Sequence, residues 1–205
     1  MHPNPLFRSR DPDANLRFAQ DRGFGVLTVN GEASPHVAHV PLLLNDTNTE
    51  VWAHLSRANP LLGALPKNGC LVVSGPDAYI SPDWYGLRSQ VPTWNYVAVH
   101  LRGHVQIAGP DTLREHLDTL AAAHEAQFPS KAPWRTTSVP PEKLEAMMRA
   151  IVPVRLSLQS VEGTWKLGQN KPRSAVHAAA ETLMDSDYGQ EVATLADWMR
   201  KEPDR

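Results

Sequence analysis

The first half of the chain alternates short apolar runs with polar breaks, a pattern typical of β-strands joined by turns. The predicted strands are FGVLTV (24–29), HVAHVPLLL (36–44), EVWAHL (50–55) and CLVVSG (70–75). After the first of them, Asn30-Gly31 predicts a hairpin, because both residues tolerate positive φ. Another strand is expected from about Tyr96 to Ile107, after a long loop. Hairpin connections of this kind make neighbouring strands antiparallel.

Helical spacing of apolar residues appears at both ends and after Pro110. The predicted helical segments are DPDANLRFAQDRG (11–23), a short helix within SRANPLLGAL (56–65), TLREHLDTLAAAHEAQ (112–127), PEKLEAMMRAI (141–151), and the tail from about 174 onward. Asp11 and Asn59 are expected to be N-caps, and Gly23 is expected to end the first helix. Between the later helices, VPVRLSLQSVEGTWKL returns to a strand pattern. This late strand must rejoin the sheet, so the sequence predicts an α+β protein with a β-barrel core.

Composition and charge narrow the classes of function. The 205 residues are 41% hydrophobic and 20% charged, as in an ordinary soluble domain. The net charge is −2, so the chain as a whole has no electrostatic attraction to nucleic acid or to an anionic membrane. No segment approaches the roughly 20 apolar residues needed to span a bilayer. A single cysteine, Cys70, fits the reducing cytoplasm.

An aromatic-rich segment interrupts the strand pattern between residues 80 and 100. Its sequence, ISPDWYGLRSQVPTWNYVAVH, holds Trp84, Tyr85, Trp94 and Tyr96 in a chain with only 7% aromatic residues. A core strand would use Val, Ile and Leu, whereas aromatic rings with polar groups on a turn suit a surface that holds a flat ligand. The alternative is that Trp84 and Tyr85 only anchor the core or an interface.

The segment HLSRANP (54–60) predicts an anion site where a strand runs into the start of a helix. Free backbone N–H groups at a helix N-terminus favour an anion. Arg57 adds a guanidinium fork and Ser56 a hydroxyl group. The same spacing is equally compatible with an ordinary ion pair between Arg57 and a surface carboxylate.

A second polar group lies in TWKLGQNKPR (164–173), at the end of the last strand. Lys166 and Gln169 follow a tryptophan, and Lys171 and Arg173 add positive charge near a helix start. The simpler explanation is a solvated junction between strand and helix. A flat aromatic ligand with a phosphate would use stacking rings, amide groups and a cationic end, which these segments together offer.

No metal site is expected, and no catalytic residue can be assigned. His36 and His39 are three positions apart on a strand, so their side chains point to opposite faces. His100 and His104 share a face but are separated by roughly 13 Å. The chain has no GxSxG motif, and Cys70 lies in an apolar run typical of an inert thiol.

Five longer motifs follow one another along the chain: HVPLLL, HLSRANP, GPDAYISPDWY, VPTWNYVAVHLRGHV and WKLGQNK. Their sequences and order resemble those of the PaiB family of FMN-binding negative transcriptional regulators. The resemblance runs from Pro5 to about Pro172. It implies an FMN-binding split-barrel domain with inserted helices over residues 1–172. The segment after it lies outside the resemblance, and its helical pattern predicts a C-terminal helical extension over 173–205.

The PaiB family is similar to the split-barrel flavoproteins related to pyridoxamine phosphate oxidase. The resemblance implies an α+β fold, an FMN-binding split β-barrel of six antiparallel strands in a Greek-key-like order, with flanking helices. It also implies a homodimer with FMN sites at the subunit interface, to which KLGQN would contribute. By match to the family motifs, the expected cofactor-binding residues are His54, Ser56, Arg57, Asn59, Thr93, Trp94, Asn95, Tyr96, Lys166 and Gln169.

Three positions depart from the family pattern. Gly168 stands in KLGQN where the family usually has Ser, which removes a hydroxyl group and adds backbone freedom. Lys171 stands where Arg is common, so a bidentate clamp becomes a point charge. Asp83 in SPDWY adds negative charge. We expect these departures to affect FMN affinity more than the fold.

Three functions are compatible with these observations. The first is an FMN-binding homodimer that acts as a negative transcriptional regulator of the PaiB type, although the dispersed cations do not support DNA binding. The second is an FMN-dependent oxidoreductase or flavin reductase that acts on a small molecule. The third is a non-catalytic module for haem or another flat ligand. In that case iron would be bound by His36, His39, His54, His100 or His104.

Overall fold

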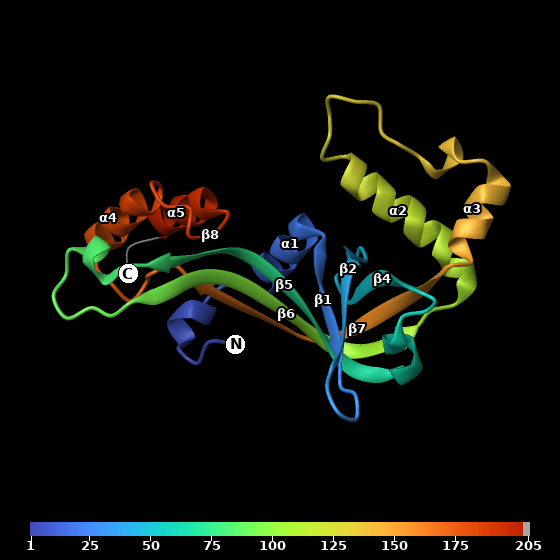
Figure 1. The fold of residues 1–205 in the computed structure, drawn as a ribbon, viewed down its shortest axis with the longest axis horizontal. Helices are drawn as coiled ribbons and strands as arrows, with labels where there is room; N and C mark the ends of the chain where they lie inside the picture. Colours follow the sequence, from blue (N-terminus) through green and yellow to red (C-terminus); the bar gives the residue numbers. More distant parts are fainter. Residues whose placement is uncertain (203–205) are drawn as a thin grey trace. The chain divides into compact units, whose positions relative to one another are not determined.

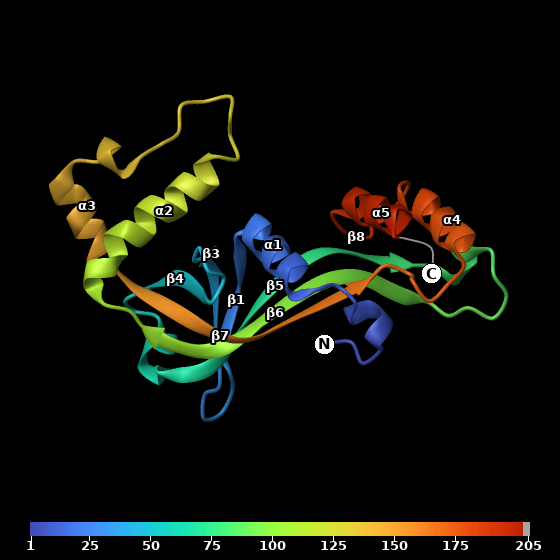
Figure 2. The same cartoon turned by 180° about the vertical axis from the view of Figure 1, so that it is seen from behind.

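The computed structural model of the protein describes residues 1–202 (Figures 1 and 2). The α-helices are Pro12–Arg22 (α1), Leu113–Glu125 (α2), Pro141–Met148 (α3), Arg173–Leu183 (α4) and Val192–Lys201 (α5). The strands are Phe24–Val29 (β1), His36–Pro41 (β2), Leu43–Leu44 (β3), Glu50–Ser56 (β4), Lys67–Ile80 (β5), Thr93–Ile107 (β6), Ile151–Lys166 (β7) and Gly189–Gln190 (β8). Short 3-10 helices are Pro5–Arg8 (η1), Pro60–Ala64 (η2), Pro82–Tyr85 (η3), Pro110–Thr112 (η4) and Thr136–Ser138 (η5).

All eight strands belong to one sheet. Its order is β2-β1-β5-β6-β7-β4-β3, and β8 pairs with β5 outside this path. β2 also lies against β4, so the sheet curls on itself. The predicted class, an antiparallel split β-barrel with flanking helices, is confirmed. The resemblance implied six strands. Six of the eight strands are longer than two residues, whereas β3 and β8 have two residues each.

The chain forms two compact units. Unit 1 comprises Met1–Asn15, Ser74–His100 and the described residues from Glu162 onward. Unit 2 comprises Leu16–Val73 and Leu101–Val161. The long strands β5, β6 and β7 contribute residues to both units. The predicted domain boundary between residues 172 and 173 stays a prediction.

Unit 2 holds the curled part of the sheet. Its strands alternate as expected for a sheet with a buried face. In β4, Val51, Ala53 and Leu55 are buried in the core, and the intervening Trp52 and His54 lie on the opposite face. Helix α2 lies over that second face, because the ring of its His116 contacts the rings of both Trp52 and His54. Figure 1 shows α2 and α3 joined by a long connection in this unit.

Unit 1 is built around the pair α4 and α5. These helices pack against each other, as Figure 2 shows from behind, and α4 also packs against η3. Leu183, Leu195 and Met199 are at most 1% exposed at this packing interface, and Tyr85 of η3 is 2% exposed. Tyr85 is therefore a core anchor, one of the two roles that the sequence left open for it.

Several local predictions are confirmed and one is wrong. Asn59 caps η2 through a hydrogen bond that its Oδ1 accepts from Leu61 N, and Gly23 follows α1 with φ of 60°. The hairpin between β1 and β2 also forms. Its loop spans residues 30–35, as the predicted strands require, but neither Asn30 nor Gly31 has the positive φ on which the prediction relied, so that reason is wrong. In the described part of the chain, no helix combines the length and apolar character needed to cross a bilayer.

Candidate functional site

The ten residues predicted to bind the cofactor fall into two groups, one in each compact unit. Unit 1 holds Thr93, Trp94, Asn95, Tyr96, Lys166 and Gln169. Unit 2 holds His54, Ser56, Arg57 and Asn59. Within each unit, the contacts show which of these side chains are available to a ligand and which are engaged in holding the fold.

In unit 1, the structure brings Lys166 of β7 together with the start of β6. Its ammonium group donates to Thr93 Oγ1 and, at 2.6 Å, to the carbonyl oxygen of Trp94. An ammonium group has three protons, so one donor remains for a ligand. Partial burial and the positive charge of Lys171 lower the pKa of Lys166. The result is a positioned donor at the edge of an aromatic surface.

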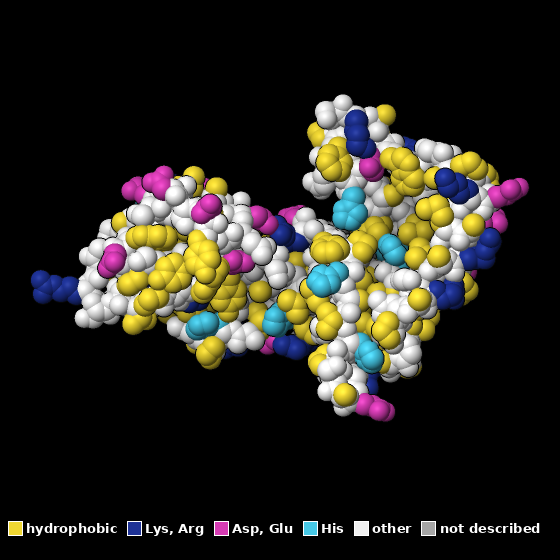
Figure 3. All heavy atoms as spheres, viewed as in Figure 1, with side chains coloured by type: hydrophobic (Ala, Val, Ile, Leu, Met, Phe, Trp, Pro, Cys, Tyr) yellow, Lys and Arg dark blue, Asp and Glu magenta, His cyan; other side chains and the backbone are white. Residues whose placement is uncertain are grey.

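That aromatic surface is formed by Trp94 and Tyr188. Trp94 is 41% exposed and Tyr188 is 64% exposed, and their ring centroids lie 5.5 Å apart at 60°. Tyr188 also contacts the ring of Tyr79 at 5.9 Å. Figure 3 shows hydrophobic side chains gathered beneath α4 and α5 in the left part of the view. Exposed rings of this kind can stack on a flat ligand.

The other two cations of the segment TWKLGQNKPR also make contacts within unit 1. Lys171 lies 4.6 Å from the ring centroid of Tyr85 and donates to Gln90 Oε1. Arg173 donates from Nε to His177 Nε2 at 3.2 Å. The group of three cations around KLGQNKPR is therefore tied to neighbouring side chains and backbone.

The side chains of Asn95 and Gln169 contact groups within the protein itself. Asn95 is 1% exposed, and its Nδ2 lies 3.5 Å from the sulfur of Met199 in α5. Gln169 closes its own turn, because its amide donates to Trp165 O and accepts from Leu167 N. Tyr96 is half-buried in β6. Their predicted roles at the flavin stay predictions.

Gly168 has a conformation that explains its identity. Its φ is 91°, in the region that favours glycine, and a Cβ atom there would lie 3.2 Å from Val176 Cγ2. The departure from the family's usual Ser at this position is thus a requirement of the turn between β7 and α4. A side chain here would strain the segment that carries Lys166 and Gln169.

In unit 2, the predicted anion site at the start of η2 lacks free backbone donors. The N–H groups of Arg57, Ala58, Asn59, Leu61 and Leu62 all have acceptors within the chain, and Pro60 has no N–H group. The expectation of free N–H groups at this helix start is therefore wrong. Its physical cause is the Asn59 cap, which satisfies the helix start that an anion would otherwise occupy.

Arg57 nevertheless retains donors. Its Nε donates to Arg149 O at 2.7 Å and its Nη2 to Ile151 O at 3.2 Å. Since a guanidinium group has five N–H donors, three remain. Arg57 also lines a cavity of about 450 Å³ with apolar walls that include Leu113 and Met148. Ser56, which precedes it, is exposed.

His54 is not free, because it pairs with His116. His54 Nδ1 lies 3.1 Å from His116 Nε2, with ring centroids 5.4 Å apart. Burial lowers the pKa of His54, and burial together with the neighbouring His54 lowers the pKa of His116 to about 4. Both rings are therefore neutral near pH 7, and one donates a hydrogen bond to the other.

Two residues that contact the predicted site residues were not predicted: His116, which contacts His54, and Tyr188, which contacts Trp94. A signal for the first existed: the buried face of α2 is Leu113, His116 and Leu120, a spacing of three and four, whereas Leu117 is only half-buried. Tyr188 lies 94 positions from Trp94 and carries no local signal.

The residue types present fit a flavin mononucleotide. An isoalloxazine ring needs a stacking surface and donors for its carbonyl edge, which Trp94, Tyr188 and Lys166 have the chemistry to supply. A phosphate group needs a cation with spare N–H groups and a hydroxyl group, which Arg57 and Ser56 offer.

Comparison with known proteins agrees with this chemistry. A family model described as "Putative FMN-binding domain" matches residues 1–160. "Protease synthase and sporulation protein PAI 2" of Bacillus subtilis is 28% identical over 191 residues, which cover 91% of each chain.

Two solved structures share the fold. The "FAD and Heme binding protein from Mycobacterium smegmatis" has a TM-score of 0.60 at 15% identity, covering 90% of this chain and 82% of that one. The "Flavocytochrome Anf3 from Azotobacter vinelandii" has a TM-score of 0.58 at 17% identity, covering 80% and 72%. At these identities the likeness shows the fold alone.

Proposed function

Since the chain belongs to the family described as "Putative FMN-binding domain", with FMN as its cofactor, we propose that it is a homodimeric negative transcriptional regulator of the PaiB type. The order of motifs and the similarity to the Bacillus subtilis protein support the PaiB assignment. The single cysteine supports a cytoplasmic location as part of the same proposal.

One observation carries the flavin part of the proposal: Lys166 is held between Thr93 and Trp94, beside two exposed rings. In this position its remaining proton would donate to a carbonyl oxygen on the edge of the flavin, and Trp94 would stack on the ring. Within unit 2, Arg57 and Ser56 have the spare N–H groups and the hydroxyl group that a phosphate needs. When bound, FMN supplies hydride- and electron-transfer chemistry, and the protein contributes orientation and charge.

The homodimer is supported by exposed apolar side chains in unit 1. Trp94 and Tyr188, whose rings contact each other, are 41% and 64% exposed, and Leu87 and Val91, in the segment before Trp94, are 36% and 74% exposed. A monomer rarely leaves several large apolar side chains in one region uncovered, and such patches mark interaction sites. A second copy of the chain is the partner that the family resemblance implies.

A second function, an FMN-dependent oxidoreductase, is favoured by the contacts of the cations in unit 1. A DNA-binding face needs cations free to contact several phosphates. Lys166, Lys171 and Arg173, the tightest group of cations in the sequence, all make contacts within unit 1. A regulatory effect that acts through flavin chemistry would need no such face.

For the haem alternative, the histidine pair of unit 2 bears on His54, one of the five candidate histidines. Its Nδ1 is directed at His116 Nε2 at 3.1 Å, so that nitrogen is not available to iron.

Three measurements on the FMN-saturated protein test the proposal. Sedimentation should give a dimer, and a monomer at micromolar concentration would contradict the homodimer. Specific DNA binding that weakens steeply with salt would support the regulator. Bleaching of the flavin by NADH or NADPH with turnover, without DNA binding, would replace the regulator with the oxidoreductase.

A further inference from the structure

A second cavity in unit 2 contains none of the residues predicted to bind flavin. It has a volume of about 360 Å³ and lies between the β3–β4 turn and helix α2. Its lining includes Leu44, Asn45, Asp46, Trp52, Glu115 and His116. Cavities of this size hold small organic molecules.

Two aromatic rings form one part of this lining. The indole of Trp52 is half-buried, and its ring centroid lies 6.4 Å from that of His116, with the planes at 33°. Leu44, 7% exposed, adds an apolar contact beside them. The lining therefore offers an aromatic face that a ligand can cover.

The charged groups in the lining are all negative. Asp46 and Glu115 contribute carboxylates, and the lining has no lysine or arginine. Neither carboxylate forms an ion pair or hydrogen bond with a described residue. The nearby Glu50 differs, because its carboxylate is bound by Arg155 at 2.9 Å. A cavity with an aromatic face and unpaired carboxylates selects a cation.

His116 provides a buried polar atom that lacks a partner. The residue is 5% exposed and lines the cavity, and its Nδ1 forms no hydrogen bond within the described chain. If Nε2–H of His116 donates to Nδ1 of His54, the free Nδ1 is an acceptor. A buried acceptor without a donor is costly, and a ligand N–H group would satisfy it.

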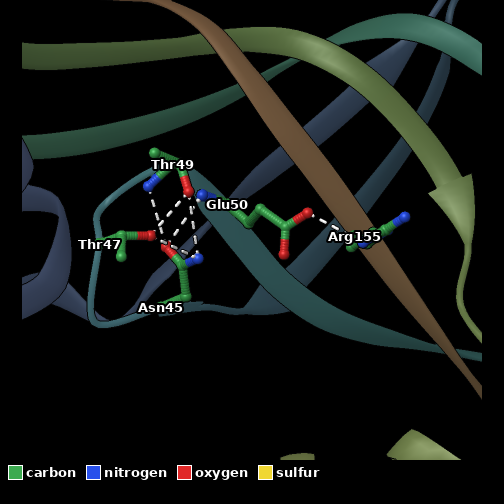
Figure 4. A network of polar contacts seen from close by, with 5 residues as sticks. All are labelled: Asn45, Thr47, Thr49, Glu50 and Arg155. Carbon is green, nitrogen blue, oxygen red and sulfur yellow. Dashed lines mark hydrogen bonds and ion pairs between the residues drawn. The ribbon is translucent and has the colours of Figure 1, made fainter.

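The turn that carries Asp46 is held by a network of hydrogen bonds around Asn45 (Figure 4). Asn45 Oδ1 accepts from the backbone N–H groups of Thr49 and Glu50 at 2.9 and 3.0 Å. Its Nδ2 donates to the hydroxyl groups of Thr47 and Thr49 at 3.0 and 3.2 Å. This network fixes the backbone beside the cavity, so a ligand would meet a preformed wall and lose little free energy in ordering it.

A metal ion is not the cation that this lining suits. Among residues 1–202, no group of three or more His, Cys, Asp or Glu side chains is placed to hold a metal. The apolar and aromatic part of the lining also suits a carbon skeleton better than a hydrated ion.

We propose that this cavity binds a primary ammonium ion carried on a small aromatic or apolar body. Asp46 and Glu115 attract the charge, Trp52 covers the apolar body and the cation, and Nδ1 of His116 accepts one ammonium proton. This site is distinct from the flavin site, so an amine is a second ligand of the same chain.

The test uses 2-phenylethylamine as probe, titrated by calorimetry into the full-length protein with and without added FMN. The neutral control is 2-phenylethanol and the anionic control is 3-phenylpropionate. The amine should bind at least about tenfold more tightly than the alcohol, since a cation–π contact and a carboxylate both favour the charge. The anionic control, 3-phenylpropionate, should not bind. Equal binding of amine and alcohol would overturn the proposal.

Variants locate the site. Glu115→Gln and Asp46→Asn are exposed changes that should each weaken the amine about threefold to tenfold and leave the alcohol unaffected. The matched control is Glu145→Gln, a carboxylate that lines the other cavity, which should leave amine binding unchanged. If Glu145→Gln weakens the amine as much as Glu115→Gln, or if FMN displaces the amine, the assignment to this separate cavity is wrong.

Discussion

The two compact units use their predicted cofactor residues in different ways. In unit 1, Lys166 is held by Thr93 and Trp94 beside exposed rings, so it is both fixed and accessible. In unit 2, Arg57 bonds to two backbone carbonyls and His54 pairs with a buried histidine. The first group is arranged like a ligand surface. The second group also joins strands to helices, so substitutions there should change stability as well as binding.

The largest effect is expected when the histidine pair of unit 2 is titrated. Burial lowers the pKa of His116 from 6.5 to about 4, so between these values the unfolded chain binds a proton that the folded chain does not. The stabilisation is complete above pH 6.5 and is lost as the pH falls toward 4. We expect a decrease of up to about 3 kcal/mol in the free energy of unfolding, measured by urea denaturation at each pH.

The control is His116→Phe, which keeps a ring on the buried face of α2 and removes the titrating group. Its stability should depend less steeply on pH between 6.5 and 4 than that of the parent. If the two proteins have the same slope, the histidine pair does not contribute to stability as described.

The next largest effect is expected at the turn of unit 1. Gly168→Ala places a Cβ atom at φ of 91°, close to Val176, and should lower the free energy of unfolding by about 1–3 kcal/mol. Gly63→Ala in η2 is the matched control, because nothing lies within 4 Å of its Cβ position. Thermal denaturation of both variants separates them. Equal melting temperatures would mean that the glycine requirement at 168 is absent.

Much of the fold followed from local patterns, because short strands and amphipathic helices carry their periodicity in the sequence. The strands from Phe24 to Ser56 and the caps at Asn59 and Gly23 are of this kind. The hairpin signalled by Asn30-Gly31 forms, but without a positive φ at either residue, because the longer loop of residues 30–35 does not need that conformation.

The candidate site was less predictable because its contacts join distant residues. The pairing of His54 with His116 spans 62 positions, and that of Lys166 with Thr93 spans 73. Motif resemblance identified Lys166 and Arg57, but only the structure shows that the donors of Asn95 and Gln169 face the interior of unit 1. Local periodicity carries no information on such contacts.

Arg57→Ala should affect FMN binding and protein stability by different amounts. It should weaken FMN about tenfold and riboflavin little, because only FMN has the phosphate that a charged hydrogen bond worth about 1.5–3 kcal/mol would hold. It should also lower stability by about 1 kcal/mol, since two carbonyl groups lose their donor.

Arg149→Ala is the control for Arg57→Ala. It removes a guanidinium from the same cavity but retains the backbone carbonyl that Arg57 contacts. Fluorescence titration should show the larger loss only for Arg57→Ala. Equal losses for FMN and riboflavin would remove Arg57 from the phosphate role.

The smallest expected effect is on the exposed ring of unit 1. Trp94→Ala should weaken FMN and riboflavin alike by about 1 kcal/mol, or roughly fivefold, because stacking involves the ring that both ligands share. Stability should change little. Trp134, 44% exposed in unit 2 against 41% for Trp94, provides the matched control as Trp134→Ala. A similar loss for both variants would show that the effect is not specific to the unit 1 surface.

The measurement that tests the central claim most directly is a visible absorption titration of the purified protein with FMN, with the bound ligand released and identified. The account predicts a flavin spectrum perturbed by binding and saturation at one FMN per chain. A protein that remains colourless and does not respond to micromolar FMN would contradict it.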